Sequence, residues 1–159
     1  FGFQSAADIA TNVIDYIHTT ALAHSRIFLV EVMGRDAGWL TLWAGIAGGA
    51  DVILIPEIPY DINKVVETIE DRKKKGRTFS IVAVAEGAIS KDDKILSEEE
   101  RRRKKEANPY STISYDIAAQ LEALTGQEAR VTVPGHYQRG GPACPYDRVL
   151  ATRFGQPAI

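Results

Sequence analysis

Residues 130–148 carry the side chains best suited to chemistry. A β-branched run breaks at a Pro-Gly pair, and His136 and Arg139 follow among glycines, three residues apart. Guanidinium groups match the oxygens of a phosphate and an imidazole adds a donor, so Arg130, His136 and Arg139 favour a phosphate site. For a His-x-x-Arg pattern alone, the alternative is a solvated loop with a surface histidine.

Met33-Gly34-Arg35 is the second candidate, and it follows the apolar run 27–32. Such a continuous run is typical of a strand covered on both faces. Asp36 would cap a helix that runs to about Ala47. Arg35 would then lie between the carboxyl end of a strand and a helix N-terminus, where free N–H groups attract anions.

Two more charged residues flank predicted strands. Glu86 directly follows the buried run 79–85, and a carboxylate there can accept hydrogen bonds from two sugar hydroxyls. Its alternative role is an acid that caps a loop. Arg26 precedes the strand 27–32 and, taken alone, would be a surface charge at the strand edge.

Hydrophobic periodicity predicts an alternation of helices and buried strands. The predicted helices are 3–24, 36–47, 62–75, 113–124 and 146–154, and the strands are 27–32, 52–55, 79–85 and a run from Arg130. This order predicts an α/β fold, a three-layer α-β-α sandwich with a mostly parallel, Rossmann-like sheet. Because the candidates at 33–35, 86 and 136–139 all follow strands, such a sheet would gather them into one pocket for a phosphorylated polyol.

Two charged runs indicate solvated surface. Residues 72–77 place cations on the last turn of a helix, before a glycine cap. At 98–104, three glutamates precede three cations at i,i+4 spacing, which supports a solvent-facing helix. We interpret residues 88–112 as a surface insertion that would suit a subunit contact.

Composition indicates neither nucleic acid nor a membrane as a partner. The formal charge is -2, and the cations lie in short runs beside acids. No apolar run reaches the roughly 18 residues of a membrane span. Cys144 is the single cysteine, which excludes an internal disulfide and favours a cytoplasmic protein. Because the chain opens on Phe1 rather than methionine, we expect a fragment of a longer protein.

The stretch 130–148 resembles the sugar-phosphate-binding signature of the 6-phosphofructokinases, which is Arg, four residues, Gly-His-x-Gln-Arg-Gly-Gly, five residues and Asp-Arg. The chain matches it at Arg130, Gly135, His136, Gln138, Arg139, Gly140, Gly141, Asp147 and Arg148. The segments 33–38, 47–51 and 85–87 are also similar to that family. No glycine-rich donor-phosphate loop and no Thr-Ile-Asp-Asn-Asp segment is present, so the resemblance covers the acceptor-binding half.

The resemblance implies roles for individual residues. Arg35 would be the catalytic contact to the transferred phosphoryl group, while the catalytic aspartate would lie upstream. The residues that would bind fructose 6-phosphate are Arg26, Met33, Gly34, Arg35, Glu86, Arg130, His136 and Arg139. Arg26 would reach the sugar 6-phosphate across a subunit interface. Asp51, Lys75 and Arg77 match an effector-binding set.

The resemblance also implies an activity, the phosphorylation of fructose 6-phosphate at its 1-hydroxyl with ATP and Mg²⁺. This chain would hold no metal, because the donor would bind mainly to other residues. The alternatives are a pyrophosphate-dependent enzyme and a non-catalytic, regulatory sugar-phosphate-binding module. A dinucleotide-binding dehydrogenase is disfavoured, because no G-x-G-x-x-G follows a predicted strand.

The same resemblance implies an organisation. Residues 1–134 would form the sugar-phosphate-binding domain, and residues 135–159 the signature loop and the start of a helix leading back to a donor-binding domain. The enzyme would be a homodimer or homotetramer with sites shared across subunits. The 159-residue piece alone would be inactive.

Overall fold

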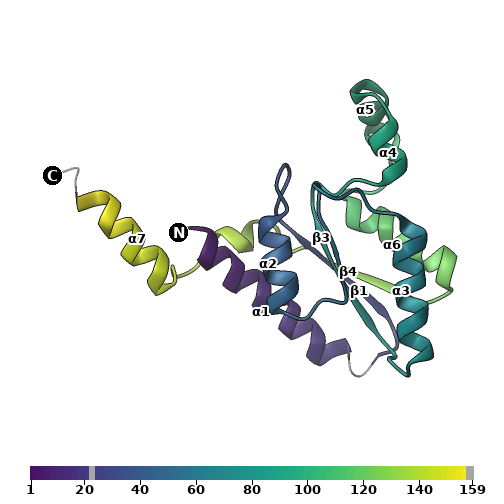
Figure 1. Cartoon of the computed structure of the whole chain (residues 1–159), viewed down its shortest axis with the longest axis horizontal. Coiled ribbons are helices and arrows are strands. Elements are labelled where there is room, and N and C mark those ends of the chain that lie inside the picture. The colour runs from purple at the N-terminus through teal and green to yellow at the C-terminus, as the bar shows by residue number, and fades with distance from the viewer. Residues whose placement is uncertain (22–23, 157–159) are drawn as a thin grey trace.

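The computed structural model describes residues 1–21 and 24–156 and has a four-stranded parallel sheet with helices on both faces (Figure 1). The order across the sheet is β2-β3-β1-β4. The strands are β1 (Ile27–Val32), β2 (Val52–Leu54), β3 (Ser80–Ala85) and β4 (Ala129–Thr132). The predicted fold class is confirmed, and the ends of the first three strands lie within one residue of the predicted ones.

Helices cover both faces because successive strand residues point to opposite sides. The helices next to the sheet are α1 (Phe3–Ala21), α2 (Trp39–Ala47), α3 (Ile62–Lys74) and α6 (Ile113–Thr125). Helices α1 and α2 pack with Phe28 and Val30 of β1, and α3 and α6 with Ile27 and Leu29. All six residues of β1 are buried, as the continuous apolar run predicted. The predicted first helix ran to His24, and residues 22–23 lie outside the described residues.

Helix α2 begins later than predicted, so Asp36 as its N-cap is wrong. The helix starts at Trp39 with Gly38 in the cap position and no side-chain cap. Gly38 donates its N–H to Glu57 Oε1 at 2.8 Å, and a Cβ on Gly38 would lie 2.5 Å from Ile55 Cβ. This close packing fixes the bend at Gly38, and Arg35 consequently lies four residues before the helix rather than beside its first turn.

The predicted insertion contains two short helices, α4 (Lys91–Ile95) and α5 (Glu98–Ala107), which stand above the carboxyl edge of the sheet in Figure 1. A capping box starts α5, because Glu100 Oε2 accepts from the Ser97 N–H at 2.9 Å and the Ser97 hydroxyl accepts from the Glu100 N–H at 3.3 Å. The base of the insertion is anchored where Lys91 donates its N–H to the Tyr60 carbonyl at 2.8 Å.

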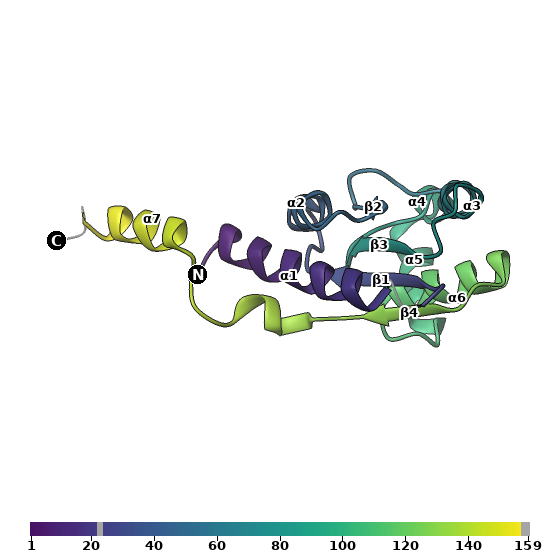
Figure 2. The same ribbon diagram turned by 90° about the horizontal axis from the view of Figure 1, so that it is seen from below.

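The chain ends in a 3-10 turn, η1 (Gly135–Arg139), and a helix, α7 (Pro145–Gly155). Figure 2 shows α7 projecting beyond the sheet, next to the start of α1. Asp147 joins the two helices, because its carboxylate accepts from the Ser5 hydroxyl and from the N–H groups of Ser5 and Gly2. Asp147, a position of the signature motif, thus accepts from N–H groups at the start of α1.

We predict that Asp147→Asn lowers the melting temperature at neutral pH. The Ser5 hydroxyl and the N–H groups of Ser5 and Gly2 lower the pKa of the Asp147 carboxyl in the folded chain. The stabilisation is therefore complete above the unfolded pKa of about 4 and is lost as the pH falls through the folded value.

Thermal unfolding from about pH 7 to about pH 2 measures this effect, with Asp15→Asn, an exposed carboxylate of α1, as the control. The gap between Asp147→Asn and the unsubstituted chain should close in acid, and a gap that stays constant would contradict the assignment.

Candidate functional site

The carboxyl ends of three strands lie side by side, because β1 pairs with β3 on one side and with β4 on the other. The loops that follow these strands carry six predicted site residues, Met33, Gly34, Arg35, Glu86, His136 and Arg139. The strand order thus collects polar groups from three separate parts of the sequence at one edge of the sheet.

The loops after β1 and β3 are in direct backbone contact. Gly87 donates its N–H to the Gly34 carbonyl at 3.1 Å, and Glu86 Oε1 accepts from the Gly34 N–H at 3.4 Å. A Cβ on Gly87 would lie 1.8 Å from the Arg35 carbonyl oxygen, and Gly34 has φ of 150°. Glycine at both positions lets the loops meet and presents the exposed side chains of Arg35 and Glu86 together.

The loop after β4 is attached to the same group through Gln138, which is 1% exposed. Its side-chain oxygen accepts from the Met33 N–H at 3.1 Å, and its amide nitrogen donates to the Gly135 carbonyl at 3.1 Å. Gln138 was predicted only as a motif position and not as a site residue. Sequence signals that point to it are its amide side chain and its place in a glycine-flanked turn.

His136 and Arg139 lie on the outer side of the turn that Gln138 anchors, and both side chains are exposed. Within the described part of the chain, neither side chain takes part in a hydrogen bond or ion pair. Gly135, with φ of 55°, provides the bend that starts the turn. An imidazole and a guanidinium with no internal acceptor can bind an anion at this edge.

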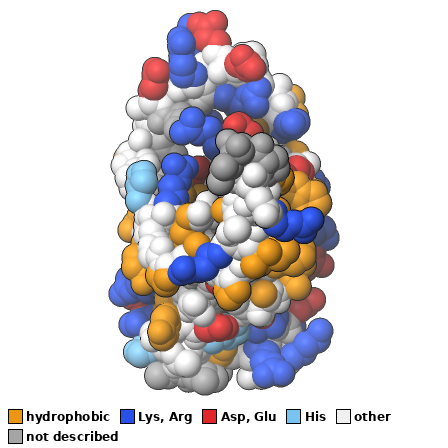
Figure 3. All heavy atoms as spheres, turned by 90° about the vertical axis from the view of Figure 1, so that its left-hand side faces the viewer, with side chains coloured by type: hydrophobic (Ala, Val, Ile, Leu, Met, Phe, Trp, Pro, Cys, Tyr) orange, Lys and Arg blue, Asp and Glu red, His pale blue; other side chains and the backbone are white. Residues whose placement is uncertain are grey.

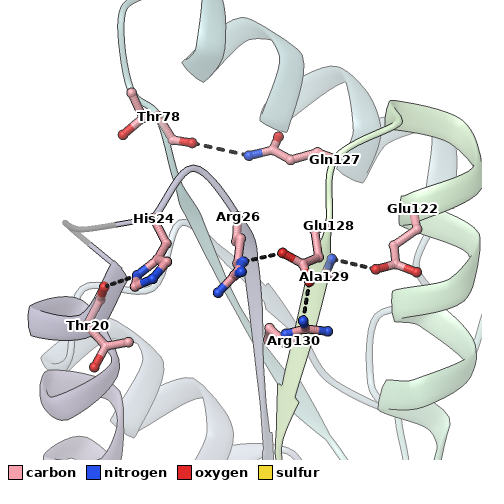
Figure 4. Close-up of polar contacts among 9 residues, drawn as sticks. All are labelled: Thr20, His24, Arg26, Thr78, Glu122, Gln127, Glu128, Ala129 and Arg130. Atoms are coloured by element: carbon pink, nitrogen blue, oxygen red, sulfur yellow. Dashed lines mark hydrogen bonds and ion pairs between the residues drawn. The ribbon is translucent and has the colours of Figure 1, made fainter.

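Arg26 and Arg130 lie at the opposite edge of the sheet, where β1 and β4 begin (Figure 4). Both guanidinium groups form ion pairs with the carboxylate of Glu128. Glu122 accepts from the Ala129 N–H at 2.7 Å and fixes the start of β4. One copy of the fold therefore does not bring Arg26 and Arg130 to the edge that carries the other predicted substrate-binding residues.

The predicted effector residues lie near the amino ends of β2 and β3. Asp51 pairs with Arg72 Nη1 at 2.8 Å and accepts from the Ile81 N–H at 2.8 Å, so its carboxylate is used within the fold. Lys75 and Arg77 are exposed just after α3. Arg72, which was predicted only as one cation of a helix end, is the partner that holds Asp51.

Neither a metal site nor a membrane span is found among residues 1–21 and 24–156. No three His, Cys, Asp or Glu side chains in these ranges are grouped so that they could hold a metal ion. No helix there is long and apolar enough to cross a membrane.

The family described as "Phosphofructokinase" matches residues 1–159. The ATP-dependent 6-phosphofructokinase of Spirochaeta thermophila is 54% identical over 158 residues, which are 99% of this chain and 43% of that protein. ATP-dependent 6-phosphofructokinase 2 of Clostridium perfringens is 49% identical over 160 residues, 100% of this chain and 44% of that protein. The chain thus spans less than half the length of these curated relatives.

Solved structures show the same similarity. A phosphofructokinase from Saccharomyces cerevisiae matches with a TM-score of 0.76 and 42% identity, over 98% of this chain and 19% of that one. A pyrophosphate-dependent phosphofructokinase from Marinobacter aquaeolei matches with a TM-score of 0.62 and 26% identity, over 85% of this chain and 32% of that one.

We predict that Gln138→Leu destabilises the fold by about 1 to 3 kcal/mol, because it leaves the Met33 N–H and the Gly135 carbonyl without their partner. Urea unfolding measures the difference. Gln127→Leu is the matched control, since its amide donates only one exposed bond, to the Thr78 carbonyl. Equal stability of the two variants would show that Gln138 does not hold the loops together.

Proposed function

The chain belongs to the phosphofructokinase family, and from this premise we propose that it is the acceptor-binding part of an ATP-dependent 6-phosphofructokinase. Such an enzyme transfers a phosphoryl group from ATP to the 1-hydroxyl of fructose 6-phosphate. The observation that carries the proposal is the gathering of Arg35, Glu86 and His136 at the carboxyl edge of three adjacent strands. Ligands bind at this edge in open α/β sheets.

The relatives support ATP as the donor. The proteins that are 54% and 49% identical to this chain are both named ATP-dependent, whereas the pyrophosphate-dependent structure is 26% identical. Pyrophosphate therefore remains the weaker alternative. We propose that Mg²⁺ binds together with the nucleotide, mainly in other parts of the protein.

The residues at the carboxyl edge of the sheet bind different parts of the acceptor. His136 and Arg139 donate to the 6-phosphate, since both are exposed donors with no internal acceptor among the described residues. Glu86 accepts from sugar hydroxyls, and Met33 and Gly34 form the backbone beneath the sugar. Arg35 stabilises the charge on the transferring phosphoryl group.

Arg26 and Arg130 contribute to the phosphate site of a second copy of the chain. They sit at the opposite edge from His136, so they contribute to a phosphate site only when another subunit places its carboxyl edge against them. Glu128 holds both guanidinium groups next to each other, which is the arrangement that two arginines need to bind one phosphate. A homodimer, or a homotetramer built from such dimers, satisfies this requirement.

Helix α7 would connect this unit to the donor-binding part. Its exposed apolar side chains are Tyr146, Val149, Leu150 and Phe154. Figure 3 faces the end of the molecule where α7 projects and shows hydrophobic patches between charged groups. An apolar stripe of this kind suits packing against a further domain. We accordingly propose that residues 1–134 and 135–159 form two units. We also propose that the enzyme is cytoplasmic.

Lys75 and Arg77 would bind an anionic effector. Both are exposed cations at the end of α3, where the helix dipole does not oppose further positive charge. Asp51 is less suited to this role, because Arg72 and the Ile81 N–H already bind its carboxylate.

The full-length protein should form fructose 1,6-bisphosphate from fructose 6-phosphate, magnesium and ATP, with far less product when pyrophosphate replaces ATP. Coupled assays with the two donors in parallel measure this. Activity with pyrophosphate alone would reverse the donor assignment. Binding of fructose 6-phosphate without turnover by either donor would instead indicate a regulatory module.

We predict that an inactive Arg26→Ala enzyme and an inactive His136→Ala enzyme recover activity when their subunits are mixed. In a mixed dimer one shared site contains both defects and the other contains none. Unfolding and refolding an equal mixture should therefore restore about a quarter of the unsubstituted activity.

The matched control mixes Arg26→Ala with Arg130→Ala. Both residues lie on the same edge and serve the same site, so every shared site keeps one defect and no recovery is expected. Failure of the Arg26→Ala and His136→Ala mixture to recover would mean that Arg26 acts within its own subunit.

A further inference from the structure

A cavity of about 430 Å³ lies between the sheet edge and the insertion. The loops after β1 and β3 contribute Arg35 and Glu86 to its lining, helix α5 contributes Arg101, and the segment before α6 contributes Tyr110 and Thr112. The insertion, predicted as a solvated surface feature, therefore forms one wall of a cavity that contains two of the proposed site residues.

Polar atoms without partners are concentrated at this cavity. Among the described side chains, the buried nitrogen and oxygen atoms that lack a hydrogen-bond partner are Thr41 Oγ1, Arg101 Nε, Thr112 Oγ1 and Ser114 Oγ. Arg101 and Thr112 line the cavity, and Ser114 lies two residues further along, in the first turn of α6. Buried polar groups normally have partners, so this grouping indicates a site built for a hydrogen-bonding occupant.

Arg101 differs from the two arginines that follow it. Arg102 and Arg103 are exposed and pair along α5, with Glu106 at 3.7 Å and Glu99 at 2.5 Å. Three consecutive residues point in different directions around a helix, and only Arg101 is turned inward, where it is half-buried. A guanidinium N–H that is buried without an acceptor is unfavourable unless a ligand supplies one.

The chemistry of the lining suits hydroxyl groups better than phosphate. Glu31, buried in β1, accepts from the Ser114 N–H at 3.2 Å and so occupies the start of α6 with an internal carboxylate. Lys104 pairs with Asp93, which raises the pKa of Lys104 and satisfies its charge. Glu86 and Asp116 add two more acids. Mixed donors and acceptors of this kind match the hydroxyls of a polyol.

We propose that the cavity receives the hydroxyl-bearing carbons of the acceptor sugar and that Arg101 donates a hydrogen bond to them. This inference rests on the proposed function and deepens it, because it extends the acceptor site from the sheet edge to the insertion. Residues 91–107 thereby contribute to substrate specificity, while the sugar phosphate stays outside the cavity, at His136 and Arg139.

Arg101→Gln in the full-length enzyme tests the proposal. The KM for fructose 6-phosphate should rise roughly tenfold, since a hydrogen bond from a charged group is lost, while the KM for ATP should not change. Arg101→Lys keeps the charge but not the planar guanidinium. Its KM for fructose 6-phosphate should lie between those of the unsubstituted enzyme and Arg101→Gln. Arg102→Gln on the same helix is the matched control and should leave both KM values unchanged.

Thermal stability separates substrate binding from a structural role. Without ligand, Arg101→Gln should melt at the same temperature as the unsubstituted enzyme or higher, because it removes a buried unpaired N–H. It should need roughly tenfold more fructose 6-phosphate for the same rise in melting temperature. A lower melting temperature without ligand would indicate a structural role for Arg101 and overturn the proposal.

The remaining outcomes distinguish this proposal from the function on which it rests. An active Arg101→Gln enzyme with an unchanged KM would overturn the role of Arg101 and leave the function intact. Binding of fructose 6-phosphate without turnover by the unsubstituted protein would overturn the proposed function alone. The role of Arg101 would then be tested by the concentration of fructose 6-phosphate that each variant needs for the same rise in melting temperature. No binding of fructose 6-phosphate at all would overturn both.

Discussion

The contact between the loops after β1 and β3 is the constraint on which the site depends. Gly87 and Gly34 share a backbone hydrogen bond of 3.1 Å, and no Cβ fits between Gly87 and the Arg35 carbonyl. Because the strands are parallel and adjacent, their carboxyl ends emerge together, and the glycines let the following residues pack backbone against backbone. Arg35 and Glu86 are then presented side by side without any direct bond between their side chains.

The sheet also explains why the phosphate site that we propose would need two copies of the chain. Parallel strands have one edge of carboxyl ends and one edge of amino ends, and residues that begin strands cannot reach those that follow them. Arg26 and Arg130 lie at the amino ends of their strands, whereas His136 follows the carboxyl end of β4. Within one copy, Glu128 is the counter-ion that keeps the two arginines together. In the proposed shared site, the phosphate of a sugar bound to a neighbouring subunit would carry more negative charge than this carboxylate and would compete with it for both arginines.

The sequence was sufficient to predict the alternation of helices and strands, because buried parallel strands and amphipathic helices leave strong hydrophobic patterns. It failed at Asp36, which local capping preference suggested as the N-cap, whereas tertiary packing of Gly38 on Ile55 set the N-cap two residues later. It also missed the structural role of Gln138, because that role depends on a hydrogen bond to Met33, 105 residues away in the chain. Long-range contacts of this kind leave no local pattern.

For charged residues, the insertion shows the same limit of what the sequence can predict. Its i,i+4 spacing correctly predicted a solvent-facing helix. Arg103 pairs with Glu99 as that spacing requires, whereas Arg102 pairs with Glu106 and not with Glu98. Which arginine lacks an acid depends on the three-dimensional surroundings, and in the described part of the chain Arg35, Arg101 and Arg139 make no ion pair. A guanidinium without an internal acid is available to a ligand directly, whereas one that pairs with an acid, as Arg26 and Arg130 do with Glu128, must exchange that acid for the ligand. Arg35 and Arg101 line one cavity, and Arg139 follows the strand next to β1, so these three arginines all lie at the carboxyl end of the sheet, where we propose the acceptor site.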